Sequence, residues 1–375
     1  MTRVLFAGGG TGGHLYPALA LAAAMRAARP DVEAHFVGAR RGIEARVLPA
    51  AGEAHTLLPL EPIRRDRIWR NWRLLPSMGR SAAGLGRLFR TLRPCLVVGT
   101  GGYASGPACA WALLRGVPLA VQEQNSYPGL VTRWLSRWAR QVHLGFPEAR
   151  RYLRPGPRTE VYALGNPIRP PDPTLDRAAC RRHFGLAPDG VVGLVVGGSQ
   201  GARAVNEALA GALEAVAGGA LDGRPAGLQL LWATGAAHVD AVRERLAPLG
   251  VDGWVKVVGY IEEMPKALAA ADFALSRAGA MATAELMAWG VPALLVPLPT
   301  AAADHQTHNA RALAEAGAAV CVAEAELSPE RLWRELRRIA EEGEVREAMA
   351  ARARERARPD AAREIAERML SLVTR

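Results

Sequence analysis

Two glycine-rich turns limit the possible folds of this chain more than any other feature. Residues 8–14 and 197–202 each follow a short apolar run, and an alanine-rich stretch of helical length follows each of them. A strand that ends in glycines and leads into a helix leaves backbone N–H groups uncovered at the positive end of that helix, where a phosphate can bind. The repeated pattern predicts two α/β domains, each with a phosphate-binding turn.

The rest of the chain repeats the alternation of apolar strand and helix. A length of 375 residues exceeds one compact core and predicts two domains. Apolar strands that alternate with helices are typical of parallel sheets covered on both faces. The proline-rich residues 165–173 form the natural boundary. We therefore expect one domain over residues 1–165, a second over 166–345 and terminal helices over 346–375, with both sheets facing a central cleft, since ligands bind beyond the carboxyl ends of such strands.

The chain carries no sequence signal for secretion or for a metal centre. Its longest apolar stretch, residues 4–25, is interrupted by the first glycine turn and has no basic leader, so we expect a cytoplasmic protein. The four cysteines are scattered and none forms a Cys-x-x-Cys pair, which indicates free thiols.

Positive charge is concentrated in the N-terminal half. Residues 1–165 hold 23 Arg against 9 acids, a net charge of +14, whereas the remainder has a net charge of −3. Within residues 63–75, several arginines alternate with apolar side chains that include Trp69 and Trp72. Such a segment is typical of contact with an anionic membrane surface, although a helix with its apolar stripe facing the core is the alternative. No nucleic-acid motif accompanies the arginines, so we expect no nucleic-acid partner.

The first glycine turn fits two kinds of site. Gly8, Gly10 and Gly13 have the spacing of a dinucleotide-binding turn, but that turn requires an acid at the end of the second strand, and residues 36–40 contain none. His14 follows the glycines directly. A helix N-terminus favours the neutral imidazole, which can accept a proton, so His14 is a candidate base; a polar helix cap is the alternative.

Six motifs occur in the order found in one enzyme family. They are residues 9–17, 101–107, 123–125, 165–169, 197–202 and 304–310. In these motifs the chain resembles the MurG family of glycosyltransferases from residue 4 to about residue 325. The resemblance implies a GT-B fold of two Rossmann-like domains. It also implies inverting transfer of N-acetylglucosamine from UDP-GlcNAc to the C4 hydroxyl of MurNAc in polyprenyl-linked lipid I, forming lipid II. The enzyme would then be peripheral to the cytoplasmic face of the bacterial plasma membrane.

The resemblance assigns roles to particular residues. His14 is the expected base or acceptor-orienting group, and Glu123 is the reserve candidate. The acceptor would contact Gly10, Thr11, Gly12, Gly13, His14, Gly102, Tyr103, Ser105 and Asn125. UDP-GlcNAc would contact Thr11, Gly12, Gly13, Asn125, Arg169, Ser199, Gln200, Gly201, Ala202, Ile261, Ala280, Met281, Glu285, His305, Gln306 and Asn309.

Leaving-group charge must also be offset during transfer. No Asp-x-Asp metal clamp is evident, so we expect backbone dipoles and Arg169 to stabilise the diphosphate, with no metal and no cofactor. One position departs from the family pattern, because Ala282 stands where relatives commonly have threonine and Thr283 comes one residue later. A phosphate contact from that hydroxyl is therefore in doubt.

Two other functions remain open on the sequence alone. A soluble UDP-sugar enzyme of the same fold, such as a UDP-GlcNAc 2-epimerase, would use both glycine turns but would leave residues 63–75 without a role. A dinucleotide-binding regulatory protein would need an acid at the end of the second strand.

Overall fold

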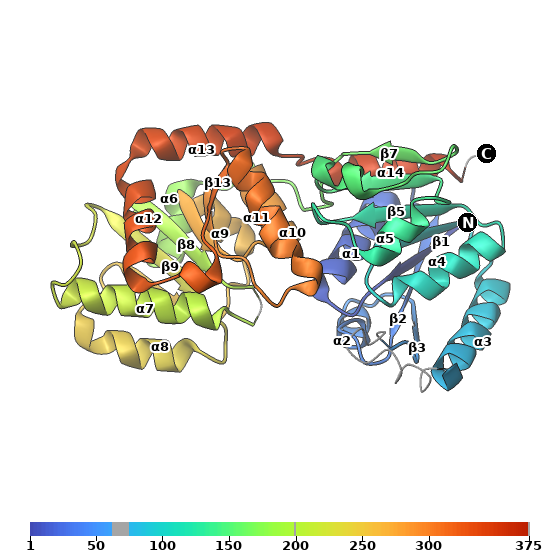
Figure 1. The fold of residues 1–375 in the computed structure, drawn as a ribbon, viewed down its shortest axis with the longest axis horizontal. Coiled ribbons are helices and arrows are strands. Elements are labelled where there is room, and N and C mark those ends of the chain that lie inside the picture. Colours follow the sequence, from blue (N-terminus) through green and yellow to red (C-terminus); the bar gives the residue numbers. More distant parts are fainter. Residues whose placement is uncertain (62–74, 199, 374–375) are drawn as a thin grey trace. The chain divides into compact units, whose positions relative to one another are not determined.

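The computed structural model describes residues 1–61, 75–198 and 200–373, which fall into two compact units (Figure 1). The first unit contains residues 1–169 and 358–375, and the second contains residues 170–357. Residues 63–74 of the predicted membrane-contacting segment, and Ser199, lie outside the described residues.

The first unit is built on a seven-stranded parallel sheet in the order β3-β2-β1-β4-β5-β6-β7. Its strands are β1 (Thr2–Gly8), β2 (Val32–Ala39), β3 (His55–Leu58), β4 (Leu96–Gly101), β5 (Leu119–Glu123), β6 (Gln141–Leu144) and β7 (Glu160–Tyr162). Its helices are α1 (Gly12–Ala28), α2 (Glu44–Ala50), α3 (Leu75–Leu92), α4 (Ser105–Leu114), α5 (Leu130–Leu135), the 3-10 helix Pro147–Tyr152 and α14 (Ala361–Ser371).

The second unit is built on a six-stranded parallel sheet in the order β10-β9-β8-β11-β12-β13. Its strands are β8 (Val191–Val196), β9 (Leu228–Ala233), β10 (Val255–Val258), β11 (Phe273–Ser276), β12 (Ala293–Leu295) and β13 (Ala319–Cys321). Its α-helices are α6 (Arg177–His183), α7 (Arg203–Ala217), α8 (Val239–Leu246), α9 (Met264–Ala270), α10 (Ala280–Ala288), α11 (His305–Glu315), α12 (Pro329–Glu341) and α13 (Gly343–Arg356). Short 3-10 helices cover Ala247–Leu249, Ala302–Asp304 and Glu324–Glu326.

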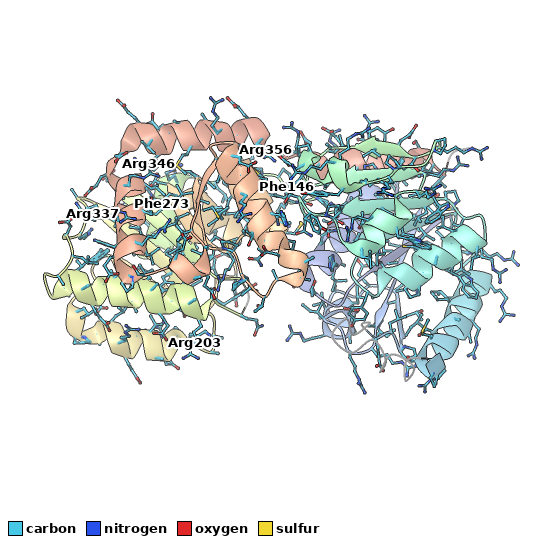
Figure 2. All side chains as sticks on the ribbon, viewed as in Figure 1. Phe146, Arg203, Phe273, Arg337, Arg346 and Arg356 are labelled. Carbon is cyan, nitrogen blue, oxygen red and sulfur yellow. The ribbon has the colours of Figure 1, made fainter. Side chains whose placement is uncertain are left out.

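Each sheet is covered on both faces, as the continuous apolar strands predict. Along β1, Leu5 faces one core, and Val4 and Phe6 face another. Phe273 on β11 is buried in the core of the second unit, which also contains Trp232 (Figure 2). The prediction of two Rossmann-like parallel-sheet domains is confirmed.

The C-terminal helices are divided between the two units. Helix α13 lies in the second unit, whereas α14 returns to the first and packs against α1. Ile365 and Met369 of α14 share a core with Leu21 and Met25 of α1. The structure divides the chain after Arg169 and again after Ala357, so the helices expected over residues 346–375 belong to two different units. Within the described ranges, no helix combines the length and the apolar character needed to cross a bilayer.

Candidate functional site

In the first unit, the first glycine turn (residues 8–14) meets the turn at residues 101–103, at the carboxyl ends of β1 and β4. These strands are neighbours, and Gly8 pairs with Gly101. Gly102 has a φ of +77°, and a Cβ there would lie 2.2 Å from the carbonyl oxygen of Gly9. Only glycine allows this approach. The ring of Tyr103 lies against Gly10, so the structure brings the predicted acceptor residues of the two turns together.

His14 lies at this junction with a defined proton position. Its Nδ1 is 3.1 Å from the carbonyl oxygen of Thr100 and 3.1 Å from Oε1 of Gln124. Gln124 Nε2 donates to Thr100 O at 2.8 Å and to Gln122 Oε1 at 2.5 Å, which fixes the orientation of the amide. Both partners of Nδ1 are thus acceptors, so Nδ1 carries the proton and Nε2 keeps its lone pair. His14 can accept a proton at Nε2.

Glu123 has a different environment. Its side chain is 3% exposed. Oε1 accepts hydrogen bonds from the backbone N and the Nδ2 of Asn125, and Oε2 accepts one from Gly129 N. The carboxylate therefore organises the loop that follows β5. Ser105 is also buried, and its hydroxyl donates to Gly102 O at 2.9 Å.

Sequence reasoning missed Glu44, the first residue of α2. Its fully buried carboxylate accepts hydrogen bonds from Gly10 N at 2.9 Å and Ala39 N at 2.7 Å. An acid thus does lie near the end of β2, but backbone N–H groups occupy both of its oxygens, which leaves it unsuited to holding a ribose. The same contact takes the N–H of Gly10 away from any ligand. The N–H groups of Gly12 and Gly13 lie in the first turn of α1, where a helix has no internal acceptors.

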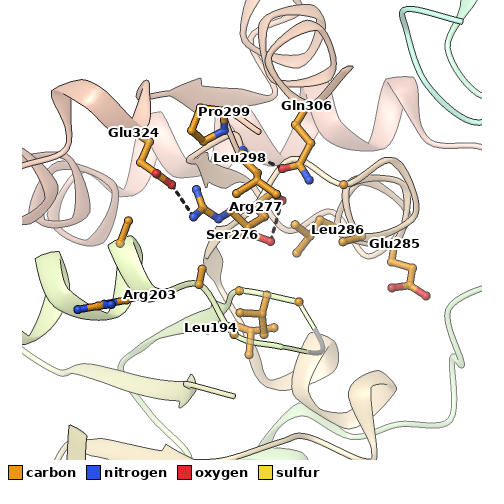
Figure 3. Close-up of a pocket in the computed structure, with 18 of the residues that line it drawn as sticks. Leu194, Arg203, Ser276, Arg277, Glu285, Leu286, Leu298, Pro299, Gln306 and Glu324 are labelled. Carbon is orange, nitrogen blue, oxygen red and sulfur yellow. Dashed lines mark hydrogen bonds and ion pairs between the residues drawn. The ribbon is translucent and has the colours of Figure 1, made fainter. Parts of the chain in front are cut away.

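The second unit contains a cavity of about 740 Å³ at the carboxyl ends of β8 and β11 (Figure 3). Its wall comes from the second glycine turn, from the β11–α10 turn and from α9, α11 and neighbouring loops. The lining residues are Leu194, Val196, Gly197, Gly198, Gly201, Ala202, Arg203, Ala204, Glu207, Met264, Leu268, Ser276, Arg277, Gly279, Ala282, Glu285, Leu286, Leu298, Pro299, Thr300, Gln306 and Glu324.

Two helices begin at the wall of this cavity without a side-chain cap. Ala202 precedes α7 and Gly279 precedes α10, and neither residue has a side-chain acceptor for a backbone N–H. By contrast, Asp176 caps α6 through its carboxylate, which accepts from Ala179 N. The positive ends of these two helices make this cavity suitable for a diphosphate.

Charged side chains line the same cavity. Arg277 extends toward Glu324, with 2.5 Å between Nη2 and Oε2, and also donates to Val296 O (Figure 3). Arg203 is the first residue of α7, where a cation is unfavourable unless an anion binds nearby. Burial raises the pKa of the Glu285 carboxyl. Sequence reasoning named neither Arg203 nor Arg277 as a site residue.

The predicted donor residues have several placements. Gly201, Ala202, Glu285 and Gln306 line the cavity, and Gln306 Oε1 also accepts from Leu298 N. Six others belong to the same unit but not to the described wall: Gln200, Ile261, Ala280, Met281, His305 and Asn309. Thr11, Gly12, Gly13, Asn125 and Arg169 belong to the first unit.

Two of these positions have clear structural roles. Asn309 is fully buried, and its Nδ2 donates to Ala278 O at 3.1 Å, which supports the β11–α10 turn. Ala282 lines the cavity with its methyl group, whereas the buried hydroxyl of Thr283 donates to Gly279 O at 3.0 Å. Thr283 therefore does not replace the missing threonine. Among the residues that the structure describes, no three His, Cys, Asp or Glu side chains gather as ligands of a metal ion would.

Comparison with known proteins identifies the family. Residues 4–144 match the glycosyltransferase family 28 N-terminal domain, and residues 192–365 match its C-terminal domain. The chain is 42% identical over 379 residues to the UDP-N-acetylglucosamine--N-acetylmuramyl-(pentapeptide) pyrophosphoryl-undecaprenol N-acetylglucosamine transferase of Moorella thermoacetica, with 99% of each chain covered. It also matches a crystal structure of Acinetobacter baumannii MurG with a TM-score of 0.78, 28% identity, and 99% and 100% of the two chains covered. The chain belongs to the MurG family of glycosyltransferases.

A more distant structural neighbour shares only the fold of this chain. A structure titled putative UDP-N-acetylglucosamine 2-epimerase from Listeria monocytogenes has a TM-score of 0.67 but only 15% identity, and covers 97% of this chain and 94% of its own. This similarity shows a common GT-B fold and no more. The MurG-family assignment therefore takes precedence over the epimerase alternative.

Proposed function

We infer that this MurG-family enzyme transfers N-acetylglucosamine from UDP-GlcNAc to the C4 hydroxyl of MurNAc in polyprenyl-linked lipid I, forming lipid II with inversion. The observation that carries the proposal is the cavity of the second unit, where two helix N-termini and two arginines can hold the UDP diphosphate. Full-length similarity to named transferases supports the choice of substrates.

On the donor side, the second glycine turn and the N-terminus of α7 bind the diphosphate. Glu285 accepts hydrogen bonds from the ribose hydroxyls, and Gln306 contacts the sugar. Ala280, Met281, His305 and Asn309 support this site, and the chain near Ile261 receives uracil. Arg169 adds positive charge near the diphosphate. Backbone dipoles and arginines offset the charge on departing UDP, so transfer needs no metal ion.

On the acceptor side, His14 acts as the base. Its Nε2 takes the proton from the C4 hydroxyl as that oxygen attacks C1 of GlcNAc, and the bond between C1 and the UDP oxygen breaks on the opposite face. General-base catalysis of this kind contributes about 10²- to 10⁴-fold in rate. Glu123 holds the loop of Asn125 in place, so we assign the base to His14 and not to Glu123.

The proposal is tested by measuring UDP release from UDP-GlcNAc with and without a soluble lipid I analogue. We expect release only with the acceptor, and an unchanged rate in EDTA. Formation of the 2-epimer without acceptor would instead establish the epimerase function. A rate that requires added Mg²⁺ would contradict metal-independent transfer.

Replacing Glu285 by alanine is expected to weaken UDP-GlcNAc binding about 10- to 100-fold, since hydrogen bonds to a charged group are worth about 1.5–3 kcal/mol. Burial raises the pKa of this carboxyl, so it loses its charge at a higher pH than an ordinary glutamate does. Donor affinity of the unmodified protein should therefore fall on mild acidification, and the variant should lack this step. Calorimetry with UDP-GlcNAc measures both effects.

Glu207→Ala is the matched control for this experiment. Glu207 lines the same cavity, but its carboxylate pairs with Arg245 at 2.7 Å. We expect little change in donor affinity. Equal losses for the two variants would show that the ribose is not bound by Glu285.

We also propose peripheral association with the anionic cytoplasmic face of the plasma membrane. The predicted segment 63–75 supports it by composition, and exposed apolar side chains on the described residues add to it. Trp134 and Trp138 are 53% and 46% exposed, with ring centroids 4.7 Å apart, and Leu130 lies one helical turn before Trp134 on α5. Arg137 and Arg140 are exposed beside them. Indole rings flanked by arginines suit an interface of anionic headgroups and acyl chains.

Changing Trp134 and Trp138 together to serine is expected to lower binding to phosphatidylglycerol vesicles at least about tenfold, since buried apolar area contributes about 25 cal/mol per Å². Co-sedimentation measures it, with neutral vesicles for comparison. Tyr260→Ser is the control, because Tyr260 is 62% exposed in the other unit. A similar loss for Tyr260→Ser, or none for the double variant, would remove this surface from the membrane interface.

A further inference from the structure

Glu44 occupies a chamber that three glycines create. A Cβ at Gly9 would lie 2.3 Å from Oε1 of Glu44, one at Gly42 would lie 2.2 Å from Oε2, and one at Gly38 would lie 2.5 Å from Cγ. None of the three has a positive φ, so turn geometry does not require them to be glycine. They must be glycine because any Cβ at these positions would overlap the Glu44 side chain. Gly9 belongs to the β1–α1 turn, and Gly38 and Gly42 belong to the end of β2 and the segment between β2 and α2.

The carboxylate joins these two segments through their backbones. Oε2 accepts from Gly10 N and Oε1 accepts from Ala39 N. Gly10 has a φ of +86°, and its inward N–H sets the direction in which the chain enters Thr11 and α1. Hydrogen bonds from N–H to an ionised carboxylate are about twice as strong as neutral ones. The buried side of the first glycine turn is therefore hydrogen-bonded to a carboxylate of the protein itself.

Given the proposed function, in which the acceptor binds this turn, we propose that Glu44 is a positioning residue for the acceptor. It holds Gly10 inward, so that the N–H groups of Gly12 and Gly13 and the ring of His14 are presented to lipid I. The ring of Tyr103 lies against Gly10, on the turn that Glu44 holds. Glu44 touches no substrate and acts through the turn.

The Glu44→Gln variant tests this role with nearly unchanged side-chain volume. An amide places an NH₂ group against one of the two backbone N–H donors, so the turn cannot keep both contacts. We expect kcat/KM for the lipid I analogue to fall at least about tenfold, while the affinity for UDP alone, which the proposed function assigns to the cavity of the second unit, stays unchanged. Loss of general stability alone would not produce this separation of acceptor from donor.

Chemical rescue provides the second measurement. Glu44→Ala leaves an empty chamber and two N–H donors, which formate can fill. Added formate should raise the melting temperature of Glu44→Ala and recover part of its acceptor kcat/KM. Glu53→Ala is the matched control, because Glu53 is also a poorly exposed acid of the first unit, paired with Arg26 at 2.6 Å. We expect that control to keep its acceptor kinetics and to gain nothing from formate.

The two levels of the proposal fail in different ways. Wild-type acceptor kinetics in Glu44→Gln, or equal rescue of Glu53→Ala by formate, would overturn the role of Glu44. Release of UDP that does not depend on lipid I in the unmodified protein would overturn the proposed function itself. Thermal rescue of Glu44→Ala by formate does not depend on the identity of the acceptor.

Discussion

Replacing His14 by alanine is expected to lower kcat by about 10²- to 10⁴-fold, the usual contribution of a positioned general base. The reason is geometric. Thr100 O and Gln124 Oε1 both accept from Nδ1, so Nε2 is the basic atom of the ring. Affinity for UDP should change little, because the cavity that we propose for UDP belongs to the other unit. Steady-state kinetics with a lipid I analogue, together with calorimetry for UDP, measure both quantities.

A second variant separates the base from its hydrogen bonds. In His14→Asn, the side-chain NH₂ can still donate to Thr100 O, but no group with the basicity of imidazole remains. We expect the same loss of kcat as in His14→Ala. Turnover of His14→Asn within about threefold of wild type would assign the base elsewhere.

Local patterns in the sequence predicted the two sheets and their glycine turns because each depends on a few adjacent residues. A buried parallel strand is recognisable as an apolar run, and a glycine turn as the residues between strand and helix. The position of α14 depends instead on packing between Ile365 or Met369 and α1, far away in the chain. No local signal for that contact exists, so the sequence predicted terminal helices but not the unit against which each of them packs.

The candidate site shows the same division between local and distant signals. His14 was recognisable from its place after the glycines. Gln124, which accepts a hydrogen bond from the His14 ring, lies 110 residues away in the chain and was recognised only as part of a motif. Glu44 gives no signal at the end of the second strand, because its carboxylate reaches back from the start of α2. The glycines at 38 and 42 were the available signal, since both make room for this side chain.

Among the variants of the proposed donor site, Gly201→Ala is expected to have the largest effect. Gly201 has a φ of +76°, and a Cβ there would lie 2.0 Å from the carbonyl oxygen of Thr234. The clashing atom belongs to the backbone, so it cannot rotate away as a side chain could. The second glycine turn must then move off the end of β9 and carry its N–H groups with it. We expect a loss of about 3 kcal/mol or more in the free energy of unfolding and at least about tenfold weaker UDP binding.

Two other glycines separate backbone strain from this clash. Gly219 has a φ of +74° with nothing within 4 Å of its Cβ position, so Gly219→Ala should cost only about 1–2 kcal/mol and leave UDP binding intact. Gly198 lines the cavity with a φ of +87° and similarly open space. Gly198→Ala should therefore resemble Gly219→Ala in stability but weaken UDP binding. Denaturant titration measures the free energies of unfolding, and calorimetry measures UDP binding. Equal losses of stability for Gly201→Ala and Gly219→Ala would mean that the second glycine turn accommodates the new Cβ without moving away from the end of β9.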